Sequence, residues 1–169
     1  MHDLWLVKQY ASDPHAHLRE LRRLAPEVPL WESTEGEVSY AYLPGHLQAT
    51  GAGWHALTRL QQLDGASARQ AAPFHYVVET NVLPDYEDEL NAWYEQEHLP
   101  GLAAVPGTVR AARYRDATGS PRYYACYDLV SLDTLGSPPW LAVRATDWSA
   151  RVRPAFRNTR RTLFRKITS

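Results

Sequence analysis

Residues 74–100 read FHYVVETNVLPDYEDELNAWYEQEHLP, and this stretch decides the fold. Its first part, His75–Leu83, is rich in β-branched and aromatic residues, which predicts a strand. Pro84 and Asp85 then open a helix, with Asp85 as the expected cap. Acidic residues at 87–89 fall in the first turn, where negative charge favours the helix dipole. The stretch therefore predicts a strand followed directly by a helix.

One face of this helix is marked by apolar and aromatic side chains at i+3 and i+4 spacing. The stripe consists of Leu90, Trp93, Tyr94, Glu97 and His98. Residues at this spacing lie on one side of a helix, so we expect the stripe to turn toward the sheet. Pro100-Gly101 and Pro106-Gly107 are expected to end the segment.

The rest of the C-terminal part continues in a regular order. Residues 108–115 and 122–130 read as two strands joined by a hairpin loop. A helical region over 132–158 follows, interrupted by Pro138-Pro139 and Pro154, and 159–167 reads as a last strand. Strand, helix, two strands, helix and strand is the β-α-β-β-α-β order of the ferredoxin-like type. The predicted fold class is α+β.

The first part of the chain shows a shortened version of the same order. Residues 3–10 read as a strand, a helix starts at Ser12-Asp13-Pro14 and stops at Pro26, and 28–33 and 37–43 read as two strands. Residues 54–63 are a strand or a short helix, since periodicity does not decide between them. We therefore predict a degenerate ferredoxin-like copy over 1–63, a linker over 64–73 and a complete unit over 74–169. The alternative is that 1–63 is an unrelated extension that covers the sheet.

The helix carries the element Asn91-Ala-Trp-Tyr-Glu-Gln-Glu-His-Leu-Pro100, followed by Val105-Pro106-Gly107 and Ala112-Arg113-Tyr114. With these residues, 74–167 resembles the dimeric α+β barrel superfamily, and its EthD-like members in particular. The resemblance implies two ferredoxin-like sheets packed as a barrel, usually in a homodimer. A chain with two copies would complete that barrel alone. Related families include monooxygenases of aromatic polyketides, haem-degrading enzymes, lactone isomerases and cyclases.

His98 is the central candidate for a functional residue. An imidazole with an ordinary pKa near neutrality can give or take a proton, and Glu97 beside it is placed to tune that pKa. We expect His98 to act as a general acid or base, or as a polar ligand contact, at the mouth of the barrel. The alternative reading is a histidine at a helix end that hydrogen-bonds backbone carbonyls. The resemblance favours the functional reading.

Strand alternation supplies neighbours for the site. Glu79 and Asn81 share a face with His75 and are expected inside the barrel, because the opposite face, with Tyr76 and Val78, is more apolar and is expected to meet the helices. Arg113 is the expected partner inside the barrel. The alternative for Glu79 and Arg113 is a purely structural ion pair. Tyr94 and Trp140 are expected to wall a pocket, although Trp140 also fits a plug over the sheet. Tyr124, Cys126 and Asp128 share one face of their strand, and the sequence leaves open whether that face is inward.

Composition narrows the classes of partner. A formal net charge of −1 does not call for nucleic acid or an anionic membrane, and the basic residues after Trp148 read as a solvated face. The single cysteine, Cys126, fits a reducing cytoplasm, and no signal peptide is apparent at the N-terminus. His98, Glu97 and His75 are suitable metal ligands, but no paired spacing joins them, so no metal is predicted.

The sequence predicts a small-molecule enzyme that uses no cofactor. Isomerisation, cyclisation or oxygenation of a small apolar or aromatic substrate suits a site without cofactor motifs. In this reading His98 is catalytic, and Asn81, Glu79, Tyr94, Glu97, Arg113 and Trp140 bind the substrate. The alternative is a non-catalytic protein that holds a small ligand or haem in the same pocket. A third reading is a structural subunit without an open pocket.

Overall fold

The computed structural model describes residues 2–10, 14–48 and 51–168, and the side chains of 14–18 are outside the description. Eight strands form a closed barrel in the order β1-β3-β2-β8-β5-β7-β6-β4. Every neighbouring pair is antiparallel. The strands are β1 (Leu4–Gln9), β2 (Leu30–Ser33), β3 (Ser39–Pro44), β4 (Trp54–Asp64), β5 (Phe74–Val82), β6 (Thr108–Arg115), β7 (Tyr123–Leu129) and β8 (Phe156–Lys166).

The barrel contains the same strand order twice. The first four strands are arranged β4-β1-β3-β2 and the last four β8-β5-β7-β6. The fourth strand of each set closes the barrel against the second strand of the other set, as β4 on β6 and β8 on β2. The predicted fold class, a ferredoxin-like α+β barrel, is confirmed, and one chain closes it. Whether the two sets arose by duplication stays a prediction.

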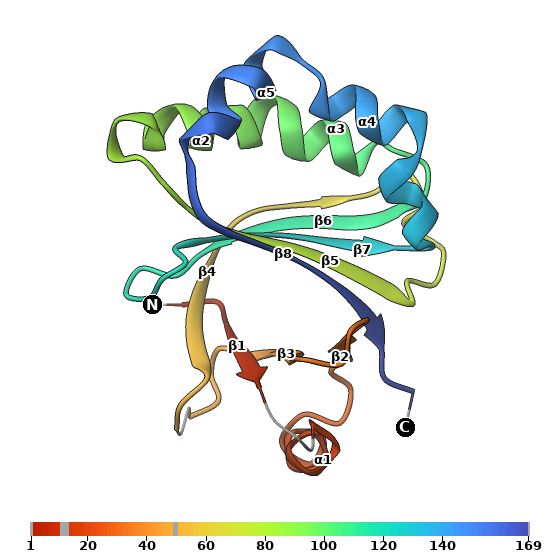
Figure 1. Cartoon of the computed structure of the whole chain (residues 1–169). Coiled ribbons are helices and arrows are strands. Elements are labelled where there is room, and N and C mark those ends of the chain that lie inside the picture. The colour runs from red at the N-terminus through yellow and green to blue at the C-terminus, as the bar shows by residue number, and fades with distance from the viewer. Residues whose placement is uncertain (1, 11–13, 49–50, 169) are drawn as a thin grey trace.

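The helices lie on two sides of the barrel (Figure 1). The larger group lies over β5, β6, β7 and β8, and α1 (Pro14–Leu24) lies against the first strands. The described residues between β3 and β4 contain no helix, so the first set of strands has one helix where the second has several. The larger group comprises α2 (Glu87–Trp93), α3 (Leu99–Ala103), α4 (Pro138–Arg144) and α5 (Asp147–Val152).

Alternation along β5 separates two cores. Val77 points into the barrel, where it packs with the aromatic side chains of Trp31, Tyr40 and Tyr124. Val78 points to the helices, where it packs with Trp93 and other residues of the helical layer. The prediction that Tyr76 and Val78 face the helices is confirmed, as is the inward direction of Glu79, which is 1% exposed.

The structure corrects several element boundaries. Residues 54–63 are in a strand, and β8 starts at Phe156, three residues earlier than predicted. Asp85 caps no helix: it lies in a 3₁₀ turn, and α2 begins at Glu87 without a side-chain cap. The predicted cap at Ser12-Asp13 falls outside the described residues. None of the described helices is long and apolar enough to span a bilayer.

Candidate functional site

The sequence predicted that the helix carrying His98 ends at Pro100, but the helix continues past this residue. After α2, residues Tyr94–His98 form one π-helical turn, and α3 continues to Ala103 with Pro100 in its first turn. Proline lacks an N–H and is tolerated where that group would have no partner. π-Helical turns occur frequently at functional sites. This turn places Tyr94 and His98 together on the buried side.

His98 is enclosed by aromatic rings between the helices and the outer face of the sheet. Its imidazole stacks on the indole of Trp93, with ring centroids 4.1 Å apart and planes at 19°. The ring of Tyr94 meets it edge-on at 5.3 Å. The side chain is 7% exposed, and its buried Nδ1 has no hydrogen-bond partner. The predicted inward direction of His98 is confirmed, but it faces the helix–sheet interface rather than the barrel mouth.

Burial sets the protonation state of His98. Desolvation, reinforced by the positive charges of Arg153 and Arg144, lowers its pKa to about 3. The imidazole is therefore neutral at physiological pH. A neutral imidazole keeps one nitrogen lone pair, which can accept a hydrogen bond or a proton.

A narrow cleft of about 30 Å³ opens beside His98. Its inner wall is aromatic, and three arginines form its rim: Arg144, Arg153 and Arg161. The same three arginines border a shallower outer hollow of about 430 Å³. The arginine side chains thus separate a small chamber with an aromatic wall from a larger surface hollow. The aromatic wall consists of Tyr76, Trp93, Tyr94, Tyr127, Trp140 and Phe156.

Trp140 and Tyr94 lie where a pocket wall was predicted. Trp140 is 2% exposed and meets Tyr127 at 5.3 Å in an edge-to-face arrangement. Burial raises the pKa of Tyr94 to about 12, against the opposing charge of Arg113, so its phenol keeps its proton. Both side chains offer flat apolar surface to the cleft.

Glu97 holds Trp93 rather than His98. Its Oε2 accepts hydrogen bonds from the Trp93 indole N–H at 3.1 Å and from the Thr146 hydroxyl at 2.8 Å. Thr146 also caps α5 by accepting from the Ser149 N–H. Glu97 therefore joins the His98 helix to α5 and fixes the ring on which His98 stacks. The prediction that Glu97 tunes His98 directly does not match this geometry.

Arg113 is not the partner of Glu79. It projects from β6 toward the helices, where its guanidinium lies over Tyr94 at 4.4 Å and Tyr123 at 4.6 Å from the ring centroids. It is 3% exposed, its Nε and Nη2 have no partner, and burial lowers its pKa. Arg113 thus supports the cleft from behind Tyr94, on the opposite face of the sheet from Glu79.

Glu79 pairs with Lys8 inside the barrel. Their Oε1 and Nζ atoms are 2.6 Å apart, and Glu79 also accepts a short hydrogen bond from the Tyr40 hydroxyl. The sequence missed Lys8 because the two residues are 71 positions apart and meet only when the barrel closes. Neither residue lines the His98 cleft.

Asn81 lies just past Thr80, the last β5 residue that pairs with β7, and its side chain turns to the β6–β7 hairpin. The register between β5 and β8 also shifts here, but the extra residue of this bulge lies in β8, where residues 158 and 159 are opposite one residue of β5. Asn81 instead accepts from the Arg122 N–H and donates to the Ser120 hydroxyl, both at 2.9 Å. It fixes the β6–β7 hairpin and does not meet His98.

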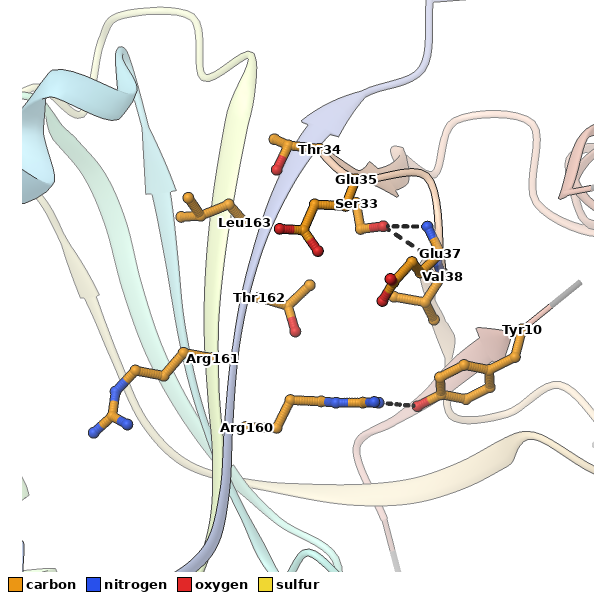
Figure 2. Close-up of a pocket in the computed structure, with 10 residues that line it drawn as sticks. All are labelled: Tyr10, Ser33, Thr34, Glu35, Glu37, Val38, Arg160, Arg161, Thr162 and Leu163. Carbon is orange, nitrogen blue, oxygen red and sulfur yellow. Dashed lines mark hydrogen bonds between the residues drawn. The ribbon is translucent and has the colours of Figure 1, made fainter.

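The basic C-terminal strand divides its arginines between two faces. Figure 2 shows Arg160 reaching toward Tyr10, whose hydroxyl accepts from it at 2.8 Å, while Arg161 points away on the other side of β8. Arg160 borders a groove of about 220 Å³ with Glu35 and Glu37, and Arg161 also reaches the His98 cleft. Strand alternation of this kind could have predicted the role of Arg161.

The comparisons with known proteins agree on the fold. No protein-family model and no curated protein matches the sequence. A ferredoxin-fold protein from Listeria monocytogenes related to antibiotic biosynthesis monooxygenases superposes with a TM-score of 0.67 at 10% identity, covering 100% of this chain and 97% of that one. A heme-degrading enzyme from the same species has a TM-score of 0.61 at 13% identity, with coverage of 95% and 98%.

An anthrone oxidase-like protein also has a TM-score of 0.61, at 12% identity, covering 99% of this chain and 92% of that one. At such identities the likeness establishes the fold alone. The EthD-like resemblance is not among these findings. This chain is therefore similar over its whole length to monooxygenase-like proteins of the dimeric α+β barrel fold.

Proposed function

We propose that this protein is a cofactor-independent enzyme that removes a proton from a small planar aromatic substrate in the His98 cleft. One observation carries the proposal: a buried, neutral imidazole keeps an unpartnered Nδ1 in an aromatic chamber rimmed by arginines. Buried polar atoms without partners are uncommon and mark sites where a ligand or water binds. The aromatic wall suits a planar apolar ring.

The rim arginines supply the other half of the chemistry. The proton moves from an acidic C–H or O–H of the substrate to His98 Nδ1, and the negative charge left on the substrate faces Arg144, Arg153 and Arg161. The low pKa of His98 belongs to the cleft without substrate. A substrate anion against the imidazolium raises that pKa, because an opposite charge favours the charged form.

The size of the cleft requires an opening step. A volume of about 30 Å³ holds only a water or two, whereas ligand pockets measure roughly 300–1,000 Å³. The groups between the chamber and the outer hollow are three flexible arginine side chains. Their displacement joins the two spaces, and their return over a bound anion excludes water.

Isomerisation, cyclisation and oxygenation can all start from such an anion. The name of one similar structure, an anthrone oxidase-like protein, suggests anthrone as the first probe. Anthrone is planar and has an acidic methylene group. Its anion reacts with dioxygen, so that anthrone and O₂ give anthraquinone and water without another reductant or oxidant.

The experiment is anthrone turnover at neutral pH, followed by anthraquinone absorbance. We expect catalysis by the wild type and a loss of roughly 10²–10⁴-fold in kcat for His98→Ala, as for other general bases. His46→Ala is the matched control, because His46 is exposed outside the cleft. Turnover that is equal in folded His98→Ala and wild type would overturn the assignment of His98.

A second candidate is a ligand-binding protein without turnover. The neutral His98 is the type of side chain that ligates haem iron, and one similar structure is a heme-degrading enzyme. The cleft as it stands does not fit a porphyrin. A Soret band that appears on haem titration and is lost in His98→Ala would favour this candidate over the enzyme.

Three further expectations belong to the same proposal. The EthD-like resemblance rests on the Asn91–Pro100 element and supports a site at His98. Internal duplication is supported by the repeated strand order. A reducing cytoplasm is supported by the single, buried Cys126.

A further inference from the structure

A second hollow lies at the end of the barrel where β5 and β6 begin and β3 and β7 end. It measures about 520 Å³, which is within the range of small-ligand pockets. Trp31, Leu4 and Leu43 supply apolar wall, and Tyr42, His75 and Cys126 bring polar atoms into it. His75 and Cys126 lie on the opposite face of the sheet from the His98 cleft, so the two spaces are separate.

A continuous chain of polar contacts runs along this hollow. Arg110 Nε is 3.2 Å from Asp128 Oδ2, and Asp128 Oδ1 is 2.7 Å from His75 Nδ1. On its other side, His75 Nε2 is 2.7 Å from the Tyr42 hydroxyl. The chain ends at Cys126, whose Sγ is 3.6 Å from the same hydroxyl. Five ionisable side chains are thus in series.

The sheet register builds this arrangement. His75 and Asp128 are direct partners across β5 and β7, and Asp128 and Arg110 are partners across β7 and β6. Tyr42 reaches the same point from β3, on the far side of the barrel. The ring of Trp31 stacks on His75 at 4.7 Å with planes at 21°, which fixes the imidazole.

The direction of the hydrogen bonds follows from Asp128. Burial opposes its ionisation, but the hydrogen bond with His75 and the positive charges of Arg110 and Lys166 lower its pKa overall. An ionised Asp128 accepts from Nδ1–H, which leaves Nε2 of a neutral His75 as an acceptor. The Tyr42 hydroxyl therefore donates to Nε2. In the 3.6 Å contact the Cys126 S–H then donates to the Tyr42 oxygen, whose second lone pair is left for another donor.

The charged side chains that line the hollow decide which ligand fits. The hollow is lined by Asp3, Asp64 and Asp128 against Arg59 and Arg110, so it carries no excess of positive charge. This differs from the arginine rim of the His98 cleft and favours a neutral ligand. Burial raises the pKa of Cys126 to about 12, so its thiol stays protonated beside Tyr42. The acceptor that remains is the second lone pair of the Tyr42 oxygen, which calls for a ligand that donates.

We propose that Tyr42, His75 and Asp128 form a second, proton-accepting site, which binds a small neutral phenol or enol at the open end of the barrel. The ligand O–H donates to the Tyr42 oxygen. As its proton moves to that oxygen, the proton of Tyr42 moves to His75 Nε2. The products are a ligand anion and an imidazolium beside the Asp128 carboxylate, so charge and protons balance without another reactant.

The probe is 4-nitrophenol, because its anion absorbs visible light and its neutral form does not. With the full chain in excess, at a pH where the free probe is mostly neutral, we expect saturable growth of the anion band. Tyr42→Phe keeps the ring and removes the acceptor, so binding weakens roughly tenfold or more. Tyr10→Phe is the matched control, since Tyr10 is exposed and bonds only Arg160 among the contacts described.

Asp128→Asn separates binding from proton transfer and serves if Tyr42→Phe does not fold. An amide does not stabilise the imidazolium, so we expect the probe to bind within about threefold of wild type but to stay neutral. The shift in melting temperature measures binding of the probe, and the absorbance of its anion measures proton transfer. The proposal is overturned if wild type produces no anion band, if folded Tyr42→Phe binds as wild type, or if Asp128→Asn still ionises the probe.

Discussion

The imidazole of His98 lies flat on the indole of Trp93, 4.1 Å from centroid to centroid. Trp93 is in turn held by its indole N–H, which points to Glu97 and to the Ser149 hydroxyl at 3.1 and 3.2 Å. The orientation of His98 therefore depends on groups that never touch it. The hydrogen bonds that hold Trp93 and the low pKa of His98 lead to separate predictions.

The first prediction concerns stability in acid. His98 titrates near 6.5 when unfolded and at about 3 when folded, so between these values the unfolded chain binds the extra proton. The free energy of unfolding then falls as pH drops from about 6.5 to about 3, by up to roughly 1.4 kcal/mol per unit. Urea unfolding of His98→Gln should show a flatter pH dependence. An unchanged slope, equal to that of His46→Gln, would contradict the pKa assignment.

The second prediction concerns Glu97. Glu97→Ala removes the charged acceptor of the Trp93 N–H and the Thr146 hydroxyl and leaves them only the Ser149 hydroxyl, which should cost about 1–3 kcal/mol in urea unfolding. Glu95→Ala, on an exposed side chain of the same turn, should stay within about 0.5 kcal/mol of wild type. Equal stabilities of the two variants would show that Glu97 does not join the helices.

The third prediction tests the ion pair inside the barrel. Lys8→Met leaves Glu79 charged and unpaired among aromatic rings, so we expect a loss of about 3–5 kcal/mol. Adding Glu79→Leu removes the stranded charge and should recover most of that loss. Chemical denaturation of the single and double variants measures both values. A double variant as unstable as Lys8→Met would mean that packing, not charge, dominates.

The fourth prediction uses two adjacent arginines on opposite faces of β8. Arg161 borders the His98 cleft, whereas Arg160 bonds Tyr10 across a different groove. Binding of 2-naphthoate, a planar aromatic anion, should weaken up to about fivefold in Arg161→Gln and be unchanged in Arg160→Gln. The difference should shrink at high salt, since exposed charges are screened. Equal affinities at low salt would argue against an anion at this rim.

Local patterns predicted the elements well where periodicity and turn residues agreed. The strand over 108–115 was predicted with its observed bounds, because the Pro106-Gly107 turn and the hairpin loop frame it. The buried stripe through Leu90, Trp93 and His98 followed from helical spacing alone. The helix nevertheless passed Pro100, since a π turn accommodates the missing N–H, and no propensity argument foresees that choice.

Local sequence patterns could not predict the contacts between strands that are distant in the chain. Glu79 faces inward as predicted, but its partner is Lys8 and not Arg113. Strand alternation pointed to Arg113 because it relates only strands that are close in the sequence. Lys8 and Tyr42 come from strands whose approach depends on barrel closure. Asn81 lies past the end of the β5–β7 pairing, where its side chain bonds the hairpin instead of facing the barrel, although Val82 after it still packs with the helical layer. Alternation is a local rule, and it does not show where a side chain at a strand end finds its partners.

The seams between the two sets of strands have a kinetic consequence. The β2–β8 seam pairs only Trp31, Glu32 and Ser33 with residues of β8, and β4 joins β6 along a longer register. Because both seams belong to one polypeptide, closing the barrel is a unimolecular step whose rate and equilibrium do not depend on protein concentration. Each set of strands is also free to accumulate its own substitutions. In the described residues, the contacts of Tyr42, His75 and Asp128 lie on one face of a sheet and the arginine-rimmed cleft lies on the other.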